Sequence, residues 1–351
     1  MKRHFSLARF ATALPILFFL SSPINAHEAW LLTPAEIEDL SRAPVPELFR
    51  SQIWLGIAAA IGFALTLVAL RFEPLIARIE GSVIAPMWRR HGDIGPLVLR
   101  WGLAVMLLLA AFGGLPRHGT DPWTVPTFLV PDMQLVNLAG SDLLIAVQIA
   151  IGGLLVVGLG TQVCGATLIA LSLAGPAVFG PAFWSYSPHF AAPGLILIAL
   201  GGGRFALDHL FGVEFGDRMV APLRQILWRA SHILIGAGFI YLGLAYKLMQ
   251  PTLLIAILEH GEMPTFGLPM PVIALVMTGV EILCGALLVT GRLVRPVALA
   301  ILGAITFLAV VLGETPLFHA NLYGALFVIV LAGQRVPVAR GVTRVAWARA
   351  V

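Results

Sequence analysis

Long apolar runs separated by short polar connections limit this chain's fold more than any other feature of its sequence. A helix needs about 20 residues to cross a bilayer, and a lone strand cannot satisfy its backbone groups in lipid. Beyond an apolar N-terminal run, we expect eight or nine transmembrane helices. They lie near residues 52–70, 97–115, 143–160, 164–181, 187–203, 226–246, 269–290, 296–313 and 317–333.

The composition excludes a soluble globular protein. Hydrophobic residues make up 59% of the 351 residues, charged residues make up 11%, and the mean hydropathy is +0.93. These values predict an all-α polytopic integral membrane protein that contacts membrane lipid. The basic pI of about 9.5 reflects arginines beside the apolar runs, so we interpret it as topology and not as nucleic-acid binding.

The first 26 residues have the pattern of a secretory signal. A basic start precedes an apolar run, and the small residue Ala26 favours cleavage before His27. An uncleaved anchor is the alternative. In both cases residues 27–96 would contain a periplasmic N-terminal segment, the first transmembrane helix and a cytoplasmic linker.

The arginines between the apolar runs indicate the orientation. One set of alternate loops contains most of them, including Arg71, Arg204 and Arg292, whereas the opposite loops hold few. The positive-inside rule places the arginine-rich set in the cytoplasm. We therefore expect a bacterial inner-membrane protein with a periplasmic mature N-terminus and a basic cytoplasmic tail at 336–351.

The chain contains an internal repeat of residues 97–210 in residues 211–335. Three pairs of residues align at nearly equal offsets: Arg100 with Arg229, Gln148 with Glu281, and His189 with His319. Each copy would hold four helices, an even number, so both copies cross the membrane in the same sense. The sequence therefore predicts a parallel repeat and not an inverted one.

The second copy resembles the four-helix unit of the DoxX/DoxD membrane proteins. The similarity lies in RASHILIGAGFIYLGLAYKLMQP and GVEILCGALLVTGRLVRP, in which a helix ends at a Lys-containing turn and the next contains a Glu followed by an Arg. LRWGLAVMLLLAAFGGLP through ALGGGRFALDHLFG resembles a diverged first copy, with Gln148 in place of the Glu. The resemblance implies two four-helix bundles and association with a membrane redox system. Together with the apolar run near residues 52–70 and the parallel repeat, it leads us to expect one N-terminal span followed by two parallel four-helix bundles.

Glu281 is the leading candidate for chemistry, because a carboxyl group inside an apolar helix costs roughly 2.5–3.5 kcal/mol and needs a partner or a use. His232 on the preceding helix could form a proton-carrying pair with it at a quinone head group. The pair could equally be a structural link between helices. Cys284, Gln148 and Tyr241 are further candidates for cofactor contacts.

Histidines suggest a metal as an alternative ligand. His189 and His319 would converge if the two copies pack about a pseudo-two-fold axis. His260 in an outer loop and His27 at the mature N-terminus could contribute to a copper site. Histidines that only bind backbone carbonyls are the simpler interpretation.

Three hypotheses for function follow. The first is a redox-complex subunit, with enzyme activity left open, that interacts with quinone or a soluble redox partner. The second is a protein that handles or transports copper or another small periplasmic solute. The third is an assembly scaffold without chemistry. Oligomer formation is compatible with each of them.

Overall fold

The structure is a computed structural model that describes residues 32–336, apart from 85, 88–91, 115–124, 137 and 214–218. Within these ranges every regular element is helical, and the β-type pairing is limited to an isolated bridge between Thr127 and Gln134. The predicted all-α class is confirmed. The predicted signal peptide, His27 and nearly all of the tail lie outside the described residues.

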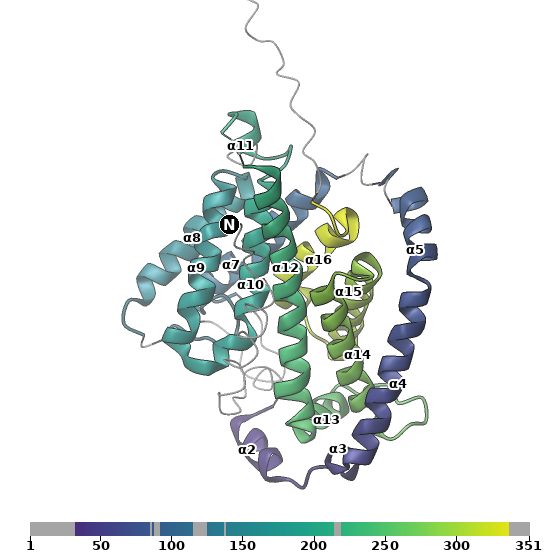
Figure 1. The fold of residues 1–351 in the computed structure, drawn as a ribbon. Helices are drawn as coiled ribbons and strands as arrows, with labels where there is room; N and C mark the ends of the chain where they lie inside the picture. Colours follow the sequence, from purple (N-terminus) through teal and green to yellow (C-terminus); the bar gives the residue numbers. More distant parts are fainter. Residues whose placement is uncertain are drawn as a thin grey trace, which may run out of the picture.

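The N-terminal elements lie along the edge of the helix bundle (Figure 1). They are α2 (Pro34–Arg42), α3 (Glu47–Arg50), α4 (Gln52–Arg71), α5 (Glu73–Ile79) and the π-helix η2 (Glu80–Ile84). Helix α2 starts at a capping box, in which Thr33 and Glu36 exchange hydrogen bonds between side chains and backbone. Helix α4 has no buried residue, as expected for an apolar helix that faces lipid on most sides.

Two units of four main helices follow. The first contains α7 (Ile94–Phe112), α8 (Ser141–Val157), α9 (Thr161–Phe179), the 3₁₀ helix η3 (Gly180–Ser185), α10 (Ser187–Leu200) and the short α11 (Leu207–Leu210). The second contains α12 (Ala221–Tyr241), the π-helix η5 (Leu242–Leu248), α13 (Pro251–His260), α14 (Met270–Thr290), α15 (Val294–Val311), the 3₁₀ helix η6 (Pro316–His319) and α16 (Ala320–Ala332). The order of main helices is the same in both units.

Six helices of the described part are long and apolar enough to cross a membrane: α4, α7, α9 with η3, α12 with η5, α14 and α15. Helices α8, α10 and α16 are apolar but have only 17, 14 and 13 residues. Helix α16 is shorter than the predicted run because residues 316–319 form the 3₁₀ turn η6. The chain is a multi-pass helical membrane protein.

The two units form one closed ring of helices. In order around it, α7 packs on α8, α8 on α9, α9 on α10, α10 on α12, α12 on α14, α14 on α15, α15 on α16, and α16 on α7. The first helix of each unit therefore packs on the fourth helix of the other. The sequence suggested two bundles side by side, but the structure joins their helices in a shared ring.

Matching arginine contacts relate the two units at the end of the bundle that includes α11. Arg100 donates to the backbone carbonyls of Leu155, at 2.9 Å, and of Phe205, at 2.8 Å. Arg229 donates to the backbone carbonyls of Leu288, at 3.0 Å, and of Val289. Leu155 and Leu288 hold the same place before Gly158 and Gly291, which end α8 and α14 with positive φ. The repeat therefore extends to side-chain contacts.

Ionic contacts connect the N-terminal helices to the second unit. Glu73 accepts a hydrogen bond from Arg292 Nε at 2.8 Å, and Glu80 lies 2.8 Å from Arg295 Nη1. The hydrogen bond from Arg292 is the main cause that lowers the pKa of Glu73. Farther along α4, Gly62 faces the side chain of Leu283 on α14. Helix α4 is therefore attached along α14, outside the ring of eight helices.

Close backbone contact joins α12 to α14. A Cβ atom added at Gly285 would lie 2.5 Å from the carbonyl oxygen of Gly236, and one added at Gly236 would lie 2.5 Å from that of Gly285. Small residues at helix crossings allow such contact in membranes, where packing is a main source of helix association. This crossing sets the position of α14 relative to α12.

We predict that Gly285→Val forces these two helices apart and lowers the free energy of unfolding by about 1–3 kcal/mol, the usual cost of overpacking. The matched control is Gly279→Val on the same helix, because a Cβ atom at Gly279 would meet nothing within 4 Å. Thermal unfolding of purified protein in detergent measures both. Equal effects of the two substitutions would contradict the predicted role of this crossing.

Candidate functional site

A cavity of ≈ 160 Å³ lies inside the ring, toward the end of the bundle that includes α13. Its walls come from α10, α12, η5, α13, α14, α15 and α16, together with the turn from residue 312 to residue 319. Most of the lining is aliphatic or aromatic. Five side chains of the lining can carry charge: His189, Lys247, Glu281, Glu314 and His319. This is an apolar cavity with ionisable groups, a combination typical of ligand sites.

The π-helix η5 brings Lys247 into this cavity. It continues α12 without a break from Leu242 to Leu248. A Cβ atom at Gly243 would lie 2.6 Å from the Ile282 side chain, so glycine allows η5 to pack closely on α14. Wide π turns occur frequently at functional sites, because they change the direction in which side chains point.

Lys247 and Glu281 form an ion pair. The Nζ atom lies 2.5 Å from Glu281 Oε2, and the two side chains are only 21% and 13% exposed. Glu281 Oε2 has no directed hydrogen bond among the described residues, so we attribute the contact mainly to charge attraction. A carboxyl in an apolar helix is thereby compensated by a cation from the neighbouring helix.

His189 and His319 converge on the cavity from the starts of α10 and α16. The His189 ring lies 5.7 Å from the ring of Phe239, and its buried Nε2 has no hydrogen-bond partner in the described part of the chain. The Asn321 amide donates to the backbone carbonyl of His189 at 2.8 Å, which connects α10 with α16. The structure therefore brings together the two histidines that the repeat pairs.

Glu314 follows α15 and lies next to His319. The closest atoms, Glu314 Oε2 and His319 Nε2, are 3.9 Å apart, which is too long for a direct hydrogen bond. Burial raises the pKa of Glu314 from 4.5 to about 7. A carboxyl with a pKa near neutrality can take up and release a proton under ordinary conditions.

The structure does not bring His232 to Glu281. His232 is fully buried on α12, its ring lies 4.9 Å from the ring of Trp228, and neither ring nitrogen has a hydrogen-bond partner among the described residues. It does not line the cavity. Because α12 and α14 are antiparallel and cross where Gly236 meets Gly285, His232 and Glu281 lie on opposite sides of that crossing. The pair involving Glu281 is formed with Lys247.

Gln148, the counterpart of Glu281, holds a loop. Its Oε1 accepts from Leu129 N at 2.8 Å, and its Nε2 donates to Thr127 O at 3.0 Å. Gln148 is fully buried by this loop and does not line the cavity. It therefore acts as the structural link that its uncharged side chain suggests.

The remaining candidates for cofactor contacts lie near the cavity but do not line it. Cys284 is a free, half-buried thiol on α14. Tyr241 packs edge-on against Tyr246, with ring centroids 5.8 Å apart, and it is Tyr246 that lines the cavity. Both residues can influence the site only through their neighbours.

The candidate metal ligands do not form a common cluster. In the described residues no group of three or more His, Cys, Asp or Glu side chains is arranged to hold a metal ion. His260 ends α13 and is exposed, whereas His27 lies outside the described residues. His189 and His319 share the cavity, but neither His260 nor any other described histidine lines it.

Lys247 and Glu314 are site residues that were not predicted from the sequence. Lys247 had a signal, because it is a lone cation at the end of an apolar run and matches the Lys-containing turn of the resembled unit. Glu314 had a weaker one, as a single acid in the short connection between two apolar runs. Its burial depends on tertiary packing, which its neighbours in the sequence do not reveal.

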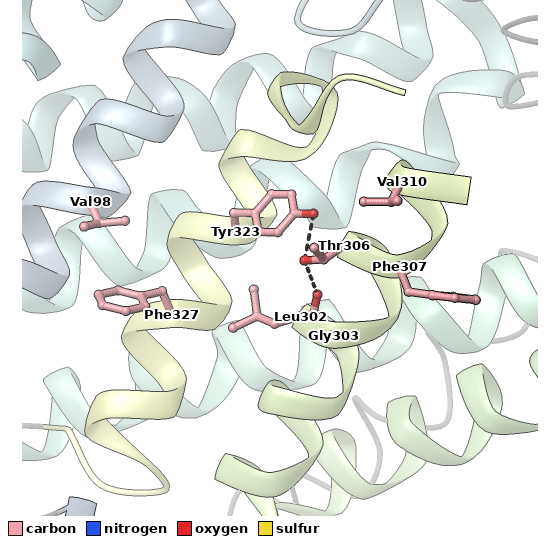
Figure 2. A pocket seen from close by; sticks show the side chains of 8 residues that line it. All are labelled: Val98, Leu302, Gly303, Thr306, Phe307, Val310, Tyr323 and Phe327. Carbon is pink, nitrogen blue, oxygen red and sulfur yellow. Dashed lines mark hydrogen bonds between the residues drawn. The ribbon is translucent and has the colours of Figure 1, made fainter. Parts of the chain in front are cut away.

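A second, larger hollow lies on the outer side of α15 and α16 and is shown in Figure 2. It has a volume of ≈ 670 Å³ and is lined by Val98, Leu302, Gly303, Thr306, Phe307, Val310, Tyr323 and Phe327. Its polar side chains are Thr306 and Tyr323, whose hydroxyls are hydrogen-bonded at 3.1 Å. No Asp, Glu, His, Lys, Arg or Cys is among the residues that line this groove, so the smaller cavity is the better candidate for chemistry.

Comparisons with protein-family models, curated proteins and solved structures give no match to this chain. The site is therefore interpreted from its own geometry.

We predict that Glu314 makes stability depend on pH. Its pKa is about 7 in the folded protein and 4.5 ordinarily, so the folded state retains a proton that the unfolded state loses. The stabilisation is complete below about pH 4.5 and is lost as the pH rises through about 7. Glu314→Gln should remove this decline, so that the variant gains thermal stability relative to the unsubstituted chain as the pH rises through this window.

The control for this measurement is Glu262→Gln, which changes an exposed carboxyl in the loop after α13. Thermal unfolding is followed in detergent across the pH range. A decline that Glu314→Gln leaves unchanged would show that other groups cause it.

We also predict that Lys247→Met destabilises the protein by roughly 3 kcal/mol, because removal of one partner leaves an uncompensated charge in a largely buried site. Adding Glu281→Gln should recover most of this loss, because the double variant no longer contains the unpaired carboxylate. Chemical unfolding of the single and double variants measures the recovery. No recovery in the double variant would mean that Lys247 stabilises the fold without Glu281.

Proposed function

We propose that this protein is a subunit of a membrane redox complex and that its cavity binds the head group of a quinone or quinol. The Lys247–Glu281 pair inside an otherwise apolar cavity is the observation that carries the proposal. A quinone head group is a flat apolar ring with oxygen acceptors at its edge. Lys247 can donate to such an oxygen, while the aliphatic lining contacts the ring.

The ionisable side chains of the cavity could exchange protons with a bound quinone or quinol. Reduction of a quinone consumes protons as well as electrons, and oxidation of a quinol releases them. Glu314, with its pKa of about 7, is suited to accept or supply a proton at the edge of the cavity. His319 lies beside it, and both side chains line the cavity.

Electrons would come from a partner protein. The described residues contain two cysteines, Cys164 and Cys284, and both are free thiols outside the cavity lining. They supply no dithiol pair for redox chemistry at this site. The resemblance of the second unit to DoxX/DoxD proteins supports the same assignment, because it implies association with a redox system.

We also propose an orientation of the protein in the membrane. We place the protein in a bacterial inner membrane, with the end that includes α11 in the cytoplasm and the cavity toward the periplasmic side. The distribution of arginines in the loops supports this placement. A soluble redox partner would then approach the loops around α13. Copper handling gains no comparable support, because the described histidines belong to no group of three or more residues that could hold a metal ion.

The proposal predicts that duroquinone binds to the purified full-length chain in detergent. Leu308→Trp places a large side chain on the cavity face of α15 and should weaken binding at least about tenfold, which corresponds to about 1.4 kcal/mol. Phe307→Trp on the groove face of the same helix is the matched control and should bind normally. Binding is measured by equilibrium dialysis, with protein-free micelles as the blank.

Glu281→Gln tests the charge at the site. It should alter duroquinone affinity because it removes the charged partner of Lys247. No saturable duroquinone binding by the unsubstituted chain, or equal binding by Leu308→Trp and Phe307→Trp, would overturn the proposed quinone site.

A further inference from the structure

The first unit contains a filled counterpart of the cavity. Helices α9 and α15 begin three residues after the equivalent glycines Gly158 and Gly291. This register pairs the α15 residues that line the cavity with residues of α9: Ile305 with Ser172, Leu308 with Gly175, and Leu312 with Phe179. Gln148 corresponds to Glu281 in the same register. The equivalent walls are therefore present in both units.

Aromatic rings occupy the space between these walls in the first unit. Phe128 stacks on Phe179 with ring centroids 5.3 Å apart, and it lies 5.4 Å from the tilted ring of Phe183. The Phe183 ring covers Gly175 so closely that no Cβ atom would fit there. Phe128 and Phe183 are 1% and 0% exposed. Phe128 from the loop and Phe183 from η3 thus fill the interior of the first unit with phenyl rings.

Polar contacts hold the backbone on both sides of Phe128 in the chain. Gln148 binds the peptide groups of Thr127 and Leu129, which flank Phe128 in the chain. Thr127 N also donates to Ala110 O at 2.8 Å. In the first unit, the residue at the Glu281 position therefore binds polar groups that directly adjoin a buried six-membered ring.

Among the described residues, no phenyl ring fills the counterpart in the second unit. There α13 covers the site, and a hollow of ≈ 160 Å³ remains beside Glu281 and Lys247. Cavities of about 150 Å³ with aliphatic and aromatic walls hold one benzene molecule. The volume thus matches a single ring, as does the phenyl ring of Phe128 in the other unit.

We infer that the cavity accepts a ligand with one six-membered ring, bound where Phe128 lies in the first unit, and excludes a fused pair of rings. The inference rests on the proposed function and narrows its substrate class to benzoquinones in preference to naphthoquinones. The ring contacts Leu308 and Leu312, and its oxygen accepts a hydrogen bond from Lys247. A second fused ring would overlap the leucine side chains of α15.

Binding of two quinones to the purified full-length chain tests the inference. The probes are 2,6-dimethylbenzoquinone, which has one ring with two methyl groups, and menadione, whose two fused rings make it the larger molecule. We expect 2,6-dimethylbenzoquinone to bind at least about tenfold more tightly after correction for partition into protein-free micelles, which corresponds to about 1.4 kcal/mol. Equal affinities, or tighter binding of menadione, would overturn the single-ring inference and leave quinone binding in place. If neither probe binds, the proposed function itself fails.

A substitution locates the source of the selectivity. Leu308→Ala enlarges the cavity on its α15 wall and should raise menadione affinity, bringing the two affinities closer together. Phe307→Ala, on the opposite face of α15, should leave their ratio unchanged. A ratio that responds equally to both substitutions would show that selectivity does not arise in this cavity.

Discussion

The ion pair between Lys247 and Glu281 is the constraint around which the second unit is organised. A carboxylate in an apolar helix needs a compensating charge, and the compensating cation is on a different helix. Several backbone features allow this contact. The α12–α14 crossing at Gly236 and Gly285 brings the helices close, and the π-helix η5 then presents Lys247 at the level of Glu281. The cavity forms beside this pair.

The first unit shows what the same framework does without the charge. With Gln148 in place of Glu281, the side chain binds backbone groups of a loop, and phenyl rings from that loop and from η3 fill the interior. An amide can satisfy one backbone donor and one acceptor at once, which a carboxylate cannot. The difference between a plugged unit and a hollow one thus follows from a small chemical change at one position, together with the length and sequence of the adjoining loop.

Several parts of this arrangement could be predicted from the sequence. Apolar runs gave the positions of the main helices, because the bilayer imposes their length and polarity. The repeat paired His189 with His319, and both line one cavity. His232 was the predicted partner of Glu281, but it lies beyond the glycine crossing, and Lys247 forms the pair instead. A π turn has no clear sequence signature, so the direction of Lys247 could not be anticipated. The burial of Glu314 depends on distant segments and was equally hidden.

The closed ring has a consequence for how such a protein is assembled. Each quartet leaves the flanks of its first and last helices uncovered, and only the other quartet covers them. Two identical quartets could associate as a symmetric pair, but both would then have to keep the same interior. Joining the two units in a single polypeptide allows their sequences to diverge. One interior can then be filled by side chains while the other keeps a cavity.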